Sequence, residues 1–228
     1  SGGGNTFFSN CTDYNNDGYM DIFLGELFHS YDSDKKDKSS ILTGKPTLLP
    51  QFYRSEIYQD DGSSKWSQGD RRGVWGDFNN DGQQDLIVEN SGFPPKSRLI
   101  FFEQDDGHAF YDVAKEAGVD MLNPSGPITM DVNNDGWMDL IIGQSNLRND
   151  QIKPRIYVFE NQRKEKGNRA IKFFLKGLRA NRDAIGSLVI LETNFGKKRQ
   201  WVETNQGGFV EQVMPDSAAD EAGIKPGD

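Results

Sequence analysis

The sequence predicts an all-β fold of repeated antiparallel sheets, and three observations support this prediction. An acidic loop of nine residues occurs three times with little change. An apolar run of strand length follows each copy directly. The segments between the copies alternate between runs rich in aromatic and β-branched residues and turn signals such as Asp-Gly. Together these features predict one structural unit that is repeated along the chain.

The repeated loop reads Asp-x-Asn-Asn-Asp-Gly-x-x-Asp, and its oxygen spacing is typical of a site for a hard cation. Calcium takes about six to eight oxygen ligands, which side chains at positions 1, 3, 5 and 9 and the carbonyl at position 7 can supply. Glycine at position 6 permits the sharp turn that this requires. The predicted ligands are Asp13, Asn15, Asp17, Tyr19 and Asp21 in the first loop, Asp77, Asn79, Asp81, Gln83 and Asp85 in the second, and Asp131, Asn133, Asp135, Trp137 and Asp139 in the third.

Two other interpretations of the loops are weaker. An EF-hand loop needs glutamate at position 12 and flanking helices, whereas this chain has Leu24, Val88 and Ile142 there, within runs that favour strands. Asn-Asn-Asp-Gly is also a plain turn signal. Three copies that keep every acidic position favour a cation, because clustered carboxylates repel one another when no cation is bound. We therefore expect up to three calcium ions, since an all-protein oxygen site suits calcium better than magnesium.

The elements follow in order along the chain. Residues 21–25 are predicted as the strand after the first loop, and residues 30–50, which are charged and contain two prolines, as an inserted surface loop. Residues 51–61 resume strand composition before a hairpin turn at 60–62. The second loop leads to strands at 86–88, 98–102 and 110–114, with a hairpin turn at 105–107 and a short turn at 115–119. The third loop leads to a strand at 155–161.

The spacing of the loops predicts β-propeller blades. Loop starts lie 64 and 54 residues apart, and about four strands fit into each interval, as in a propeller blade. The strands are apolar through their middle, which is typical of sheets that are buried on both faces. Three loops supply fewer blades than a closed propeller needs, so we expect part of a larger propeller.

Three stretches resemble known families. The loops followed by Asp-Leu-Ile-Val, over residues 5–162, resemble FG-GAP (VCBS) repeats, the calcium-binding blades of integrin-like propellers, in the form found in cartilage-acidic-protein-like sequences. Residues 163–209 resemble the small antiparallel ASPIC/UnbV domain, with strands expected at 170–178, 186–192 and 199–204 around a turn at 194–198. Residues 210–228 resemble the start of an HtrA-type PDZ domain.

Charge and composition exclude some classes of function for this protein. The net charge is −9, which three calcium ions would bring to −3, so the acidity reflects predicted ligands more than a basic partner. No dense basic stripe points to nucleic acid. The single cysteine, Cys11, excludes an internal disulfide, and no apolar run is long enough to span a membrane. Because cytosolic calcium would leave weak loops empty, we expect an extracytoplasmic location: secreted, periplasmic or in an organelle lumen.

The sequence does not predict an enzyme. His29 and His108, the only histidines, are expected at the surface, and no nucleophile has a readable partner. We expect a non-catalytic calcium-binding propeller module that contacts a protein partner or serves as an accessory subunit of a larger complex. The alternative is a carbohydrate-binding or accessory module of a secreted hydrolase, with Trp66, Trp137 and Trp201 as stacking residues, although core packing is the commoner use of such side chains.

Overall fold

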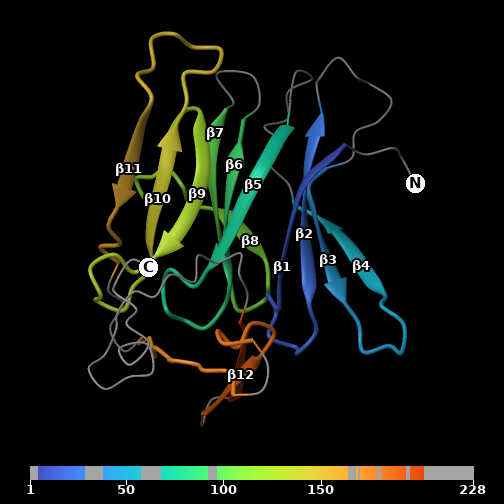
Figure 1. The fold of residues 1–228 in the computed structure, drawn as a ribbon. Helices are drawn as coiled ribbons and strands as arrows, with labels where there is room; N and C mark the ends of the chain where they lie inside the picture. The colour runs from blue at the N-terminus through green and yellow to red at the C-terminus, as the bar shows by residue number, and fades with distance from the viewer. Residues whose placement is uncertain are drawn as a thin grey trace.

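The computed structural model describes residues 5–28, 38–57, 68–91, 97–163, 168, 170–178, 181–193 and 196–202. Thirteen strands form within these residues, and no helix occurs among them (Figure 1). The prediction of an all-β fold is confirmed.

The strands form three consecutive meanders and a separate hairpin. The first sheet holds β1 (Thr6–Thr12), β2 (Asp21–Phe28), β3 (Ser40–Gly44) and β4 (Phe52–Glu56), and the second holds β5 (Gln68–Gly76), β6 (Asp85–Asn90), β7 (Arg98–Gln104) and β8 (Phe110–Asp112). These two sheets join where Leu27 and Phe28 of β2 pair with Gly69 and Gln68 of β5. The third sheet holds β9 (Pro124–Met130), β10 (Asp139–Gln144) and β11 (Arg155–Phe159), and β12 (Leu188–Thr193) pairs with β13 (Gly196–Trp201).

Each meander repeats one plan around an acidic loop. The loops connect β1 to β2, β5 to β6 and β9 to β10, so each joins the first strand of a sheet to the second. All three loops lie at the same edge of the sheets, toward β12 (Figure 1). This arrangement is compatible with part of a β-propeller.

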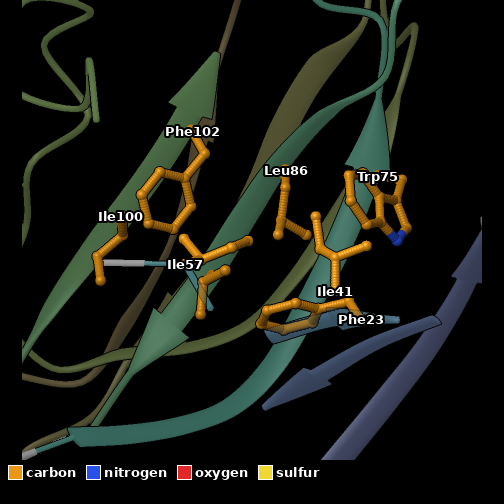
Figure 2. Close-up of a cluster of buried hydrophobic side chains, with 8 residues drawn as sticks. Phe23, Ile41, Ile57, Trp75, Leu86, Ile100 and Phe102 are labelled. Carbon is orange, nitrogen blue, oxygen red and sulfur yellow. The ribbon is translucent and has the colours of Figure 1, made fainter. Parts of the chain in front are cut away.

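The core lies in two layers between the sheets because side chains alternate along the second sheet. On β6, Leu86 and Val88 face the first sheet and pack with Phe23, whereas Ile87 faces the third sheet and packs with Leu140. Figure 2 shows the first cluster, in which Leu86 and its neighbours from the second sheet meet side chains of the first. The middle strand is therefore buried on both faces, as its apolar run predicts.

The outer face of the third sheet has no covering sheet among the described residues. Leu99 pairs opposite Glu89 on the second sheet, and Ile156 holds the equivalent place opposite Gly143 on the third. Leu99 is 0% exposed, whereas Ile156 is 75% exposed. The same apolar pattern is thus buried in one sheet and open in the next.

Several predicted elements are wrong in detail. Residues 40–44 form the strand β3 instead of a surface loop, because Ile41 fits into the first core cluster. Residues 170–178 form no strand. The last hairpin pairs Thr193 with Gly196, so Lys197 and Lys198 lie in β13 and not in the turn. The strands that precede the loops were not predicted at all, since β5, for example, mixes glycine with charged residues.

Other predictions agree with the structure or lie outside the described residues. The turn at 105–107 is closed by the amide of His108, which donates to the carbonyl of Asp105 across 2.9 Å. Residues 115–119 form a turn without a helix. The turn at 60–62, residues 30–37 of the 30–50 segment, and the PDZ-like tail at 210–228 fall outside the described residues, as do His29 and Trp66.

Candidate metal centre

The first aspartate of each loop binds the main chain of its own loop. In the first loop the two carboxylate oxygens of Asp13 accept hydrogen bonds from the nitrogens of Asp17 and Gly18, both at 2.9 Å. The equivalent bonds recur in the other loops at 2.8 to 3.1 Å. The aspartate at position 1 therefore sets the turn in all three copies.

Left-handed backbone explains two further positions of the motif. The asparagine at position 4 has φ of 58°, 53° and 59° in the three loops, and the glycine at position 6 has φ of 95°, 85° and 89°. Asparagine tolerates this region better than most residues, and glycine adopts it without a steric penalty. The Asn-Asp-Gly sequence is thus required by the turn itself, whatever the loop binds.

The aspartate at position 9 joins its loop to a neighbouring strand or segment. One oxygen of Asp21, Asp85 and Asp139 accepts from the amide at position 2 of the same loop, at 2.8 to 3.1 Å. The other oxygen accepts from a second amide, that of Gly44, Gln104 or Asn161, at 2.7 to 3.0 Å. These three carboxylates are buried, so each anchors its loop from inside the sheet.

The residues at positions 3, 5 and 7 complete the shared pattern. In the first loop the side-chain amide of Asn15 donates to Asp17, and Asp17 accepts from the nitrogen of Tyr19 at 2.8 Å. The second and third loops repeat both bonds. All the predicted ligand residues therefore lie in three loops of one design.

Burial leaves several loop carboxylates electrostatically uncompensated. Desolvation raises the pKa of Asp13, and raises the pKa of Asp21 to about 7, that of Asp77 to about 6 and that of Asp85 to about 8. Neighbouring loop aspartates raise these pKa values further, whereas main-chain hydrogen bonds lower them. A bound cation would remove this penalty by supplying the missing positive charge.

Basic residues of the C-terminal segment, residues 168–202, lie against the loops. Lys172 forms an ion pair with Asp131 at 2.8 Å. Lys198 donates to the carbonyl of Gly82 at 3.0 Å, and Arg199 donates to the carbonyl of Asn16 at 2.6 Å. The sequence does not predict these contacts, because neighbouring basic residues such as Lys198 and Arg199 give no sign of which distant loop they contact.

Comparison with known families supports the repeat assignment. Residues 77–142 match the model of the FG-GAP-like repeat family. The match begins at the first aspartate of the second loop and ends in β10, so it spans two of the three loops. No curated protein matches the chain. The likenesses of residues 163–209 to ASPIC/UnbV and of 210–228 to PDZ domains stay predictions.

The loops fit calcium in donor type and order. Each offers three carboxylates and one amide oxygen, the hard ligands that calcium prefers. In the described part of the chain, however, no group of three or more His, Cys, Asp or Glu side chains is arranged to hold a metal ion. The carboxylates instead bind amides of their own loop and of neighbouring strands or segments. The calcium sites therefore stay a prediction that the donor chemistry supports.

Two further side chains, those of His108 and Trp137, are candidates for roles other than metal binding. His108 is exposed, as predicted, and its ring nitrogen lies 2.6 Å from Gln104. Trp137 is only 8% exposed, so the expectation that it offers a stacking face for sugars is wrong. Among the described residues, no helix is long and apolar enough to cross a membrane.

Proposed function

We propose that this chain is a non-catalytic calcium-binding module of the β-propeller type that mediates protein interaction. The observation that carries the proposal is one hydrogen-bonding pattern repeated in three loops, each with a buried aspartate at position 9. Each loop binds one calcium ion through the residues at positions 1, 3, 5, 7 and 9. FG-GAP-like repeats suggest a propeller-type interaction module, which agrees with this assignment.

Calcium has a structural role in this proposal. The aspartate at position 9 already connects the loop to a neighbouring strand or segment, as Asp85 does with Gln104 of β7. An ion at the loop compensates the charge of this buried carboxylate and stabilises the first three strands of a sheet together. Calcium therefore sets the stability of the scaffold, while its surfaces contact the partner.

We propose an extracytoplasmic location and an accessory role in a larger complex on the same basis. Loops with three carboxylates and no bidentate glutamate suit the higher calcium concentrations found outside the cytosol. An interaction role also accounts for the apolar residues that the described structure leaves exposed on the third sheet, Ile128, Ile156 and Val158.

Thermal unfolding tests the proposal. The melting temperature is expected to rise in calcium, to rise much less in equimolar magnesium, and to fall in a chelator. The double variant D81A/D85A is expected to lower the melting temperature. It should also reduce the calcium-dependent rise in melting temperature by the part that the second loop contributes. A chain carrying D150A, an exposed aspartate outside the loops, is the control. An equal calcium shift in the double variant and the control would contradict the proposal.

A further inference from the structure

The C-terminal segment covers the same point of all three loops. A Cβ atom on Gly18 would lie 3.4 Å from Arg199, and one on Gly136 would lie 3.6 Å from Ala170. A Cβ atom on Gly82 would lie 2.5 Å from Lys198, closer than real contacts allow. Gly82 therefore serves both the turn and the close approach of this segment, whereas a Cβ on Gly18 or Gly136 would make an ordinary contact.

The three basic residues contact their loops in two different ways. Arg199 and Lys198 donate to the main-chain carbonyls at positions 4 and 6, which are not predicted ligands. Lys172 instead binds the carboxylate of Asp131, the ligand at position 1 of the third loop. Lys172 also donates to the side-chain oxygen of Asn134 at 2.7 Å, so it contacts a second residue of this loop.

We infer that Lys172 is a built-in competitor of calcium at the third loop. This inference rests on the proposed function, since it names what regulates one of the three calcium sites. The ammonium of Lys172 and a calcium ion both require the oxygens of Asp131, so occupancy by one opposes occupancy by the other. Arg199 and Lys198 lower the pKa of Asp13 and Asp77, which burial raises, only through their charge, because their hydrogen bonds go to main-chain carbonyls. Their competition with calcium is therefore weaker.

Burial explains why Lys172 competes with calcium without blocking it. The side chain of Asp131 is 5% exposed, whereas that of Lys172 is 42% exposed. The lysine can withdraw into water at low cost, because a half-exposed ion pair contributes little free energy. A divalent ion that contacts several oxygens then replaces one monovalent group. The third loop is thus the weakest of the three and loads last.

Loading of the third loop also changes the C-terminal segment. When calcium takes Asp131, Lys172 loses this ion pair but keeps its hydrogen bond to Asn134, so the contact of residues 170–178 with this loop is weakened, whereas the contacts of β13 with the first two loops persist. Calcium at high concentration therefore loosens one part of the segment and leaves the hairpin in place.

Terbium luminescence sensitised by tryptophan tests the inference on the full chain. Trp137 lies at position 7 of the third loop, but Trp75 lies two residues before Asp77 and stacks on Tyr14 of the first loop. The part of the tryptophan-excited emission that W137F removes therefore reports the third loop. Displacement of terbium by calcium gives the calcium affinity.

K172M is expected to tighten calcium binding at the third loop by about 1.4- to fivefold, the range for removal of a partly exposed ion pair. K198M is the matched control: it removes the same charge near the second loop but frees no carboxylate, so a smaller change is expected in its calcium affinity, followed by calorimetry.

The outcomes separate the two proposals. If the wild type binds calcium and K172M tightens the third loop no more than K198M tightens the second, Lys172 is not a competitor and the inference is overturned while the proposed function stands. If neither chain binds calcium by calorimetry, the proposed function fails and the inference fails with it.

Discussion

The main-chain nitrogen of Gln104 donates to a carboxylate oxygen of Asp85 across 3.0 Å, so a loop residue holds the third strand of its own sheet. Gly44, the last residue of β3, makes the same contact with Asp21, and Asn161 makes it with Asp139 just after β11. The position that the sequence predicts as the last metal ligand is therefore also a structural link. Substitutions at this position must separate the two roles.

The variants Asp85→Ala and Asp85→Asn are expected to separate the structural link from metal binding. Without calcium, the alanine variant leaves two buried amides unpaired and should lose about 1–3 kcal/mol of unfolding free energy. The asparagine variant keeps an acceptor oxygen and removes a buried charge, so it should stay closer to the wild type. In the presence of calcium, both variants should lose the stabilisation that calcium bound at the second loop provides. Urea denaturation with and without a chelator measures this, and equal losses in the absence of calcium would contradict the link.

The pH dependence of stability should reverse with calcium. Burial raises the pKa of Asp21 to about 7 and that of Asp85 to about 8, above the usual 3.8. Between the usual pKa of 3.8 and these raised values, the calcium-free folded state therefore binds more protons than the unfolded state. Its stability should fall as pH rises from about 4 to 8. Calcium must displace these protons, so its stabilising effect should grow over the same window. Melting curves in chelator and in calcium check both slopes.

Gly82→Ala tests the approach of the C-terminal segment. The backbone there has φ of 85°, and a Cβ would collide with Lys198. Gly118, with φ of 73° and no atom within 4 Å of an added Cβ, provides a control with the same backbone cost. Both alanine variants should lose about 1 kcal/mol from the backbone, and only Gly82→Ala should also raise hydrogen exchange in β13. Equal hydrogen exchange in β13 of the two variants would show that the position of Lys198 does not depend on this glycine.

The repeated sheets predict unequal effects at equivalent positions. Leu99→Ala removes a fully buried side chain and should cost about 2–5 kcal/mol. Ile156→Ala, at the equivalent place on the third sheet, should change stability by about 0.5 kcal/mol or less because its side chain is exposed. Chemical denaturation of both variants measures these two changes in stability. A large loss at Ile156 would mean that another surface covers the third sheet.

The acidic loops could be predicted from sequence because their structure is local. Asp13 binds the nitrogens of Asp17 and Gly18, and Asn16 and Gly18 adopt the left-handed backbone of the turn. The residues of the motif are therefore the residues that the turn requires. The apolar run after each loop predicts a strand for the same reason. The repetition of one sheet per loop could be predicted too, since the spacing of the repeat depends only on counting residues between loops.

Contacts between distant segments could not be predicted. The nitrogen of Arg199 donates to the side chain of Asn16 at 2.7 Å, a contact that joins residues 183 positions apart. Lys197 and Lys198 looked like hairpin turn residues because their place in β13 depends on pairing with β12. Strand β3 was missed because Ile41 is buried only once the first two sheets pack together.

Equilibrium dialysis against calcium tests the central claim most directly. Three loops of one design predict about three calcium ions bound per folded chain at saturation, and loss of one ion in the double variant D81A/D85A. A folded chain that binds no calcium, or a double variant that binds as much as the wild type, would contradict the account.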